Sequence, residues 1–233
     1  MTPTAPRPSP ASQGHPGPEP SPAEAVIEAI QQDLVFARIR PRERLVEADW
    51  AKRFDVARYV IRQALDELEH RGVVRRERNK GAVVHDFSLF EVECICEMRV
   101  LLQGRAMQTV ALPGDAAWIK RLSATQKAHA AAVERREVAE VYRLNKEFHE
   151  IQFETVNNPY LADQIRYFTW LLDVVRSYRL HGPALNPKAP REHAAMVDAI
   201  RKGDREEIVR LSINHIPPAR EVFYRIRQWS GDD

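Results

Sequence analysis

From Ser88 onwards, large apolar residues recur every three or four positions, and no segment shows the strict alternation of a half-buried strand. This periodicity predicts helices over about residues 88–112, 116–135, 138–156, 159–180, 190–202 and 204–229. In the first of these helices the apolar positions are Cys94, Met98, Leu101, Leu102 and Met107. Successive helices without a sheet can bury their apolar sides only against one another, so residues 87–233 are predicted to form an all-helical bundle.

The chain before this bundle begins with a different composition. Residues 1–20 are rich in Pro, Ser, Ala and Gly and hold almost no large apolar side chain, so they are predicted to be a disordered tail. Order is expected to begin at Ser21, which forms a capping box with Glu24 and precedes a Pro at the first helical position. The helix is broken by Pro41 and presents on one face Ile27, Ile30, Leu34 and Ala37.

Residues 47–70 carry two helical patterns joined by a tight connection at Asp55 and Val56. The second pattern runs to about His70 and has an inward stripe made of Ile61, Ala64, Leu65 and Leu68. Its opposite side holds Arg58, Tyr59, Arg62 and Gln63. Two arginines one turn apart near the start of such a helix are typical of a recognition helix in a DNA major groove, although a solvated surface face has the same composition.

A basic loop lies between two β-branched runs that begin at Val73 and end at Val84. The loop ends in Gly81, which can adopt the positive φ of a hairpin turn, so a β-hairpin is predicted. Helix, helix-turn-helix and hairpin together make residues 21–86 a winged helix-turn-helix. The hairpin offers positive charge to a nucleic-acid backbone through Arg75, Arg76, Arg78 and Lys80.

Overall composition limits the partners and the cellular compartment that can be expected for the protein. The 233 residues carry a formal net charge of only +2, so nucleic-acid contacts have to come from local clustering. Cys94 and Cys96 lie two residues apart in a helical pattern, where their side chains diverge, and are predicted to be free buried thiols. No apolar run approaches the ~20 residues that span a bilayer, so the protein is expected to be soluble and cytoplasmic, without a membrane partner.

Asn145 and His149 lie four residues apart in a helical pattern, which puts an amide oxygen and an imidazole on one helix face. Two later helical segments carry His193 and His215. Three imidazoles and one amide oxygen from three helices of one bundle would make a ligand set for a divalent ion such as Zn, Ni or Mn. The alternative is that these histidines belong to the core without binding a metal.

The chain resembles the GntR family of bacterial transcription regulators, in the branch with an all-helical FCD effector-binding domain. In the N-terminal part the resemblance rests on Leu45, Glu47, Ala51, Phe54, Val56, Arg58, Arg62, Ala64, Leu65, Leu68, Gly72 and Gly81. The sequence departs from the family at Ala57, where a Ser is usual, and at Val60, where a Pro is usual. Asp55 is expected to replace part of the lost helix capping.

The resemblance also implies roles within the bundle. An arginine of the first FCD helix commonly faces the ligand cavity, and Arg99 fits that position. The alternative is a surface arginine that pairs with Glu91, Glu97 or Gln103. Metal-binding members use an Asp or Asn, a His one turn later and two further His, an order matched by Asn145, His149, His193 and His215. No ligand role is expected for His15, His70, His85, His129 or His181.

Taken together, these features predict a transcription regulator and not an enzyme. We expect a repressor that binds double-stranded operator DNA as a homodimer and responds to a small carboxylate effector at the open metal positions. A three-His metalloenzyme is one alternative, because Glu147 and Glu150 lie close to His149, but it leaves the winged helix unexplained. A metal-free regulator of a bulkier ligand, such as an acyl thioester, is the other.

Overall fold

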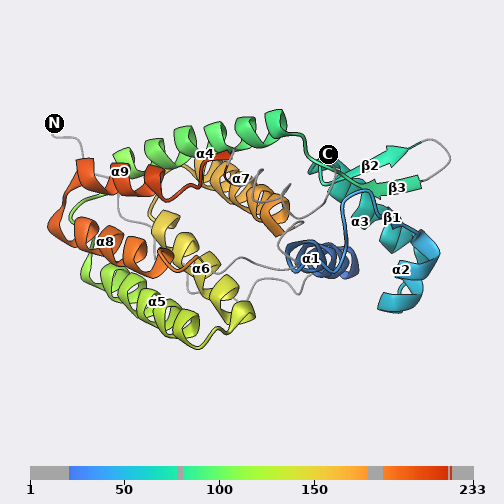
Figure 1. The fold of residues 1–233 in the computed structure, drawn as a ribbon, viewed down its shortest axis with the longest axis horizontal. Helices are drawn as coiled ribbons and strands as arrows, with labels where there is room; N and C mark the ends of the chain where they lie inside the picture. Colours follow the sequence, from blue (N-terminus) through green and yellow to red (C-terminus); the bar gives the residue numbers. More distant parts are fainter. Residues whose placement is uncertain (1–20, 78–80, 178–185, 220, 222–233) are drawn as a thin grey trace, which may run out of the picture.

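The computed structural model describes residues 21–77, 81–177, 186–219 and 221, and the predicted tail, residues 1–20, lies outside them. The described elements are α1 (Pro22–Val35), β1 (Arg44–Leu45), α2 (Glu47–Phe54), α3 (Arg58–His70), β2 (Val74–Glu77), β3 (Gly81–Val84), α4 (Leu89–Thr109), α5 (Ala116–Glu134), α6 (Val138–Phe153), α7 (Pro159–Ser177), α8 (Ala189–Lys202) and α9 (Arg205–Asn214). Figure 1 shows α2, α3 and the strands at one end of the molecule and a bundle of helices at the other.

The N-terminal end is a winged helix. α1 begins with the predicted capping box, in which the Ser21 hydroxyl accepts from the backbone N–H of Glu24 and the Glu24 carboxylate accepts from the N–H of Ser21. α2 and α3 form the predicted helix-turn-helix, and the inward stripe of α3 is buried. β2 and β3 pair antiparallel with Val74 opposite Val84, and β1 completes a sheet of order β1-β3-β2.

Three details of this end differ from the sequence prediction. α1 ends at Val35, because Ala37 takes a left-handed φ of 52° and directs the chain away from the helix axis. β1 is only two residues long and was not predicted, since its pairing depends on β3 and not on a pattern of its own. Asp55 has a left-handed φ of 52° as the C-cap of α2, so it does not cap α3, whose N-cap Ala57 makes no side-chain hydrogen bond.

The C-terminal end is the predicted all-helical bundle. α5 packs against α6 and α8, while α4 packs against α7 and α9. The core between them contains Met107, Trp118, Phe148, Met196 and Ile208. The structure therefore confirms a mainly α fold with an N-terminal winged helix. Among the described residues, no helix combines the length and the hydropathy that a bilayer crossing requires.

Two predictions about the bundle are wrong. α9 ends at Asn214 and does not continue into one long helix, because Pro217 and Pro218 follow, and proline provides no N–H while it disfavours helical backbone before it. In α4, the side chains of Cys94, Met98 and Leu101 are exposed and are not the buried stripe. The buried side of α4 is set by its contacts with α7 and α9 and includes Val92, Ile95, Cys96, Arg99 and Gln103.

One hydrophobic core joins the two ends. Ile30 of α1 and Leu68 of α3 belong to the same cluster as Val92 of α4 and Leu172 of α7. α1 and α7 are in direct contact across this junction. A displacement of α4 or α7 is therefore transmitted to the winged helix through close-packed side chains.

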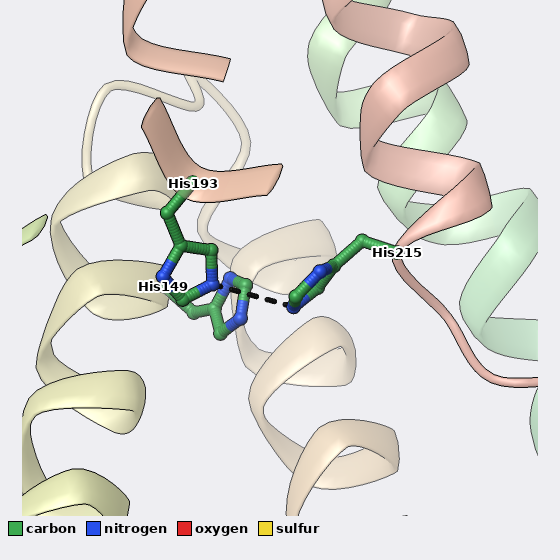
Figure 2. A group of neighbouring side chains, drawn as sticks. All are labelled: His149, His193 and His215. Carbon is green, nitrogen blue, oxygen red and sulfur yellow. Dashed lines mark hydrogen bonds between the residues drawn. The ribbon is translucent and has the colours of Figure 1, made fainter. Parts of the chain in front are cut away.

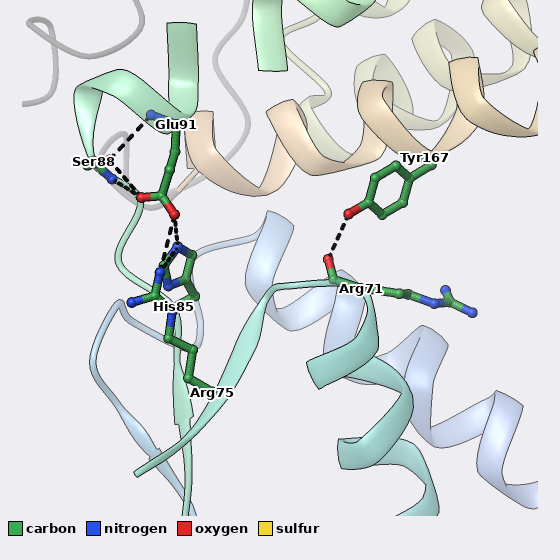
Figure 3. A network of polar contacts seen from close by, with 6 residues as sticks. All are labelled: Arg71, Arg75, His85, Ser88, Glu91 and Tyr167. Carbon is green, nitrogen blue, oxygen red and sulfur yellow. Dashed lines mark hydrogen bonds and ion pairs between the residues drawn. The ribbon is translucent and has the colours of Figure 1, made fainter. Parts of the chain in front are cut away.

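Polar contacts cross the junction beside this core, as Figure 3 shows. The Tyr167 hydroxyl of α7 donates to the backbone carbonyl of Arg71, the C-cap residue of α3, at 3.2 Å. On the wing side, the Nε2 atom of His85 lies 2.8 Å from Arg75 Nη2 and 2.9 Å from Glu91 Oε1. Glu91 also forms the capping box of α4, so the start of that helix is tied to the wing.

Candidate metal centre and nucleic-acid interface

Three histidines from three parts of the bundle meet at one point. His149 lies on α6, His193 on α8 and His215 at the C-cap of α9, and one ring nitrogen of each lies within 4.8 Å of the others. The Nε2 atoms of His193 and His215 are 3.3 Å apart (Figure 2). His149 and His193 are only 8% and 0% exposed. The three side chains are thus held together inside the protein.

Hydrogen bonds on the far side of two rings fix which nitrogen carries the proton. Gln152 Oε1 lies 2.9 Å from His149 Nδ1, and Glu192 Oε2 lies 2.6 Å from His215 Nδ1. An amide or carboxylate oxygen can only accept, so each Nδ1 donates and each Nε2 keeps a free lone pair. Gln152 is itself oriented, because its amide donates to the Ser212 hydroxyl at 3.0 Å.

Burial favours the neutral imidazole at His149 and His193. It lowers the pKa of His149 well below the usual 6.5, and the nearby His215 adds to this shift. It also lowers the pKa of His193 well below 6.5, with His149 as the next cause. The hydrogen bond from His215 lowers the pKa of Glu192, which therefore stays ionised at neutral pH. Neutral imidazole is the form that binds a metal ion.

The contacts of His193 are compatible with a bound cation and equally with a proton shared with His215. The Nδ1 of His193 is buried and has no hydrogen-bond partner among the described residues. Its Nε2 faces the Nε2 of His215, although Glu192 already holds the proton of His215 on the opposite nitrogen. Two nitrogens at this distance repel unless a proton or a cation lies between them. The donors therefore fit a divalent ion that prefers imidazole nitrogen.

A cavity of about 90 Å³ adjoins the cluster. Asn145, one turn before His149, lines it from α6, and Arg99 lines it from α4. Arg99 is only 5% exposed, so the alternative of a surface arginine does not describe this structure. The Gln103 side chain can present its amide oxygen to Arg99, 3.3 Å from Nε and 2.9 Å from Nη2. Three of the four predicted metal ligands, Asn145, His149 and His215, thus line one cavity with Arg99, and His193 joins them through the histidine cluster.

His129 was assigned no role from the sequence, but it belongs to the same group. It is 1% exposed, lines the cavity from α5, and its ring centre lies 5.0 Å from that of His193. Its Nδ1 has no partner within the described part of the chain. The signal was present, because the buried face of α5 has helical spacing through Leu122, Thr125, His129 and Ala132.

The carboxylates that an enzyme would need are occupied on the outside of α6. Glu147 Oε2 lies 2.7 Å from Arg143 Nη1, and Glu150 Oε1 lies 3.8 Å from Lys146 Nζ. Neither residue lines the cavity of about 90 Å³ that adjoins His149, His215 and Arg99. The carboxylate that does line this cavity is that of Asp173 on α7.

The predicted DNA-contacting residues lie on the exposed side of α3. Arg58, Tyr59, Arg62 and Gln63 are all exposed, opposite the buried stripe. Arg62 Nη2 lies 3.2 Å from Glu47 Oε2 of α2. Gly81 begins β3 with the predicted positive φ, at 75°. The two wing cations Arg78 and Lys80 lie outside the described residues.

The other two wing cations are paired within the chain. Arg76 forms ion pairs with Asp66 and Glu69 of α3, and Arg75 Nη2 lies 3.2 Å from Glu91 Oε1. These exposed pairs are weak and exchangeable, but they offset part of the positive charge expected for the wing.

Two family models match the sequence. The model of the bacterial regulatory proteins of the gntR family matches residues 22–84, and that of the FCD domain matches residues 94–217. The uncharacterized HTH-type transcriptional regulator YdhC of Bacillus subtilis is 27% identical over 181 residues, which cover 76% of this chain and 80% of that protein. The HTH-type transcriptional repressor RspR of Escherichia coli K12 is 21% identical over 209 residues, 90% of this chain and 92% of the relative.

Solved structures share the fold. A transcriptional regulator GntR from Rhodococcus sp. RHA1 aligns with a TM-score of 0.73 at 16% identity, over 87% of this chain and 97% of that one. Escherichia coli McbR/YncC aligns with a TM-score of 0.72 at 15% identity, over 91% of this chain and 100% of that one.

Proposed function

The chain belongs to the GntR family of bacterial regulatory proteins and carries an FCD domain, so it is a DNA-binding transcription regulator and not an enzyme; from this premise we propose that a divalent metal and a small carboxylate effector at the histidine cluster control its affinity for operator DNA. Residues 21–86 would bind the DNA and residues 87–233 the metal and effector. We propose that the protein acts in the cytoplasm, where bacterial chromosomal DNA lies.

The convergence of the three imidazoles carries the proposal. His149, His193 and His215 would bind Zn, Ni or Mn through Nε2, with the amide oxygen of Asn145 as the fourth ligand. Gln152 and Glu192 hold two of the rings in the required orientation. When bound, the ion would supply an open coordination position for an anionic oxygen.

The charge balance of the site favours a carboxylate. All four proposed ligands are neutral, and one carboxylate, that of Asp173, lines the same cavity. A divalent ion there would carry more positive charge than this carboxylate offsets, which is costly in a buried place unless an anion meets it. The buried guanidinium of Arg99 adds a second positive group on the same cavity. Arginine binds carboxylates through two parallel hydrogen bonds, so Arg99 would orient the effector.

We propose that the protein is a repressor, by analogy with RspR, which is named as one. An effector that favours one arrangement of the bundle can loosen operator binding, since the bundle and the winged helix share a core. Linkage then requires that DNA loosen effector binding by the same factor.

A homodimer would suit a palindromic operator, and α4 offers a surface for it. Exposed residues on α4 follow each other at intervals of four, three, four and three, as Cys94, Met98, Leu101, Arg105 and Gln108. This is the spacing of a helix-pairing seam. Glu97 and Arg105 lie one turn on either side of Leu101, so an antiparallel pair centred there would place opposite charges together twice.

Metal analysis tests the proposal most simply. Purified wild type should retain about one ion per chain, whereas His149→Ala, His193→Ala and His215→Ala should each lose most of it. Exposed His70 on α3 provides the control, since His70→Ala should keep the wild-type content. Asn145→Asp should bind the ion more tightly but the carboxylate less tightly, because the Asp already neutralises part of the charge. Equal metal content in wild type and all three variants would remove the site.

A further inference from the structure

A second cavity, of about 340 Å³, adjoins the one at the histidines. Its walls come from α6 and α7 of the bundle and from the winged helix, through Gln31 of α1 and Arg71 at the end of α3. The two cavities share the residues Tyr142, Asn145, His149, Thr169 and Asp173. A molecule that enters the larger cavity can therefore reach the metal ligands without leaving the protein.

Aromatic rings form part of the wall of the larger cavity, beside the charged residues Arg71, Lys146, Glu150, Arg166 and Asp173. Tyr142, Phe153, Tyr167 and Trp170 all line it. The indole nitrogen of Trp170 is buried and has no acceptor within the described part of the chain. Aromatic rings pack well against other flat rings, edge to face or offset. The larger cavity thus adds the rings of Phe153, Tyr167 and Trp170 to the residues that it shares with the smaller one. The guanidinium of Arg99 and the imidazoles of His129 and His215 line the smaller cavity and not the larger.

Size decides which part of a ligand each cavity takes. The space of about 90 Å³ at the histidines accommodates a carboxylate but leaves little room for a ring. The space of about 340 Å³ lies within the range of ordinary small-molecule sites. We propose that the larger cavity binds the planar aromatic body of an effector whose carboxylate points to the histidine cluster. This rests on the proposed function, which it deepens by naming an aromatic carboxylic acid as the ligand class.

The position of the cavity also explains how its occupant would reach the DNA-binding end. Tyr167 and Arg71 both line the cavity, and the Tyr167 hydroxyl donates to the Arg71 carbonyl at 3.2 Å (Figure 3). Arg71 is the C-cap residue of the recognition helix. A ring inserted beside Tyr167 would therefore act on the end of α3 through this hydrogen bond. Tyr167 is a positioning residue in this scheme.

The test uses the metal-loaded full chain labelled with 5-fluorotryptophan, with 2-naphthoate, cyclohexanecarboxylate and acetate as probes. Fluorine NMR should show the Trp170 signal, assigned with Trp170→Phe, moving with 2-naphthoate and not with acetate. The signals of Trp50 in α2 and Trp118 in the bundle core should stay in place, because neither residue lines the cavity. 2-Naphthoate should bind on the order of tenfold or more tightly than acetate, with cyclohexanecarboxylate between them.

The outcomes separate the cavity from the metal. If acetate binds in a metal-dependent manner while 2-naphthoate binds no better and leaves Trp170 unmoved, the aromatic site is overturned and the proposed function stands. If 2-naphthoate moves Trp170 equally with and without chelator, the aromatic site stands and capture of the carboxylate by the metal is wrong. If 2-naphthoate does not bind at all, the aromatic site is overturned, and metal analysis still decides the proposed function.

Tyr167→Phe tests the link to the DNA-binding end. It keeps the ring in the cavity wall but removes the hydrogen bond to Arg71. At 2-naphthoate concentrations that saturate each protein, as set by its own measured dissociation constant, the effect of the ligand on DNA affinity should be several-fold smaller in the variant than in wild type. Tyr160→Phe is the matched control, since Tyr160 lies on the same helix, is 81% exposed and does not line the cavity. An undiminished effect on DNA affinity in Tyr167→Phe would exclude this route.

Discussion

The histidine cluster and the exposed face of α3, which is proposed to contact DNA, differ in the length and the burial of their side chains. The cluster uses short imidazoles that are buried, and the hydrogen bonds that two of the rings donate to Gln152 and Glu192 fix their orientation. The α3 face uses long, exposed side chains, and Arg62 is already paired with Glu47. The proposed metal would therefore meet a prepared site, whereas DNA that contacts Arg62 would have to compete with the Glu47 carboxylate.

This difference predicts how each region responds to mutation. At the cluster, loss of one side chain removes a ligand from a rigid set, so the effect should be large and depend on the metal. On α3, DNA binding would replace an ion pair within the chain by one with a phosphate. The loss of one such side chain should therefore have a smaller effect, and one that depends on salt.

The largest effect is expected for His193→Ala. The variant loses a proposed ligand and the stacking of His193 on Phe148, whose ring centres are 4.0 Å apart. With metal at about a thousand times its dissociation constant, the free energy of unfolding should fall by about 4 kcal/mol from lost binding alone. Denaturant unfolding with and without chelator measures this, with His70→Ala as the control. A loss of the same size in chelator would show that the metal contributes nothing.

Leu101→Glu should have the next largest effect if the protein binds its operator as a homodimer that presents two α3 helices. A carboxylate at the centre of the proposed α4 seam would be buried without a partner, which should raise the dimer dissociation constant about 100-fold, or about 3 kcal/mol. Sedimentation across a range of concentrations measures it. The control is Tyr160→Glu on α7, where the native side chain is 81% exposed. Sedimentation identical to wild type would remove the seam from the dimer.

Arg58→Ala and Arg62→Ala should weaken operator binding by about 1 to 3 kcal/mol each if they contact bases. Glu47→Gln should strengthen binding, because it releases Arg62 from its ion pair. Arg78→Ala and Lys80→Ala should weaken binding to all sequences and each reduce the salt slope by about 1. Anisotropy titrations at several salt concentrations distinguish these cases. Unchanged affinity in folded Arg58→Ala and Arg62→Ala would contradict the recognition-helix assignment.

The smallest effect concerns the pH dependence of the junction. Burial lowers the pKa of His85 below the usual 6.5, with Glu91, Arg75 and Asp86 as smaller influences of mixed sign. Because the folded pKa is below the unfolded one, the stabilisation is complete above pH 6.5 and is lost as the pH falls below it. His85→Gln should flatten the fall in stability below that pH, by at most about 1.4 kcal/mol per pH unit. Melting curves of His70→Gln should keep the wild-type slope, and an unaltered slope in His85→Gln would refute the prediction.

The sequence could predict those parts of the fold that depend on nearby residues. α2 and α3 have the expected bounds, the predicted capping box at Ser21 is present, and α4 begins after Ser88 as predicted, because spacing and capping act within one or two turns. The exposed side of α4 could not be predicted in this way. Its helix is apolar on several sides, and only the packing of α7 and α9 decides that Leu101 faces outward while Gln103 is buried.

The candidate site shows the same division. The order of Asn145, His149, His193 and His215 could be recognised as a pattern in the sequence. The structure brings the three histidines together and places Asn145, His149 and His215 on one cavity. The groups that orient them could not be predicted from the sequence, because the orientation of the Gln152 side chain depends on a hydrogen bond to Ser212 of another helix. His129 was dismissed because it matched no ligand position, although its place on the buried face of α5 was visible in the spacing.

Operator affinity measured with and without both metal and carboxylate tests the regulatory link most directly. An operator fragment selected by the protein from genomic DNA would be titrated with metal-loaded and chelated protein, each with saturating 2-naphthoate or none. The carboxylate should weaken operator binding in metal-loaded wild type and have little effect in chelated protein or in His215→Ala. An equal response in all three samples would contradict control of DNA binding through the histidine cluster.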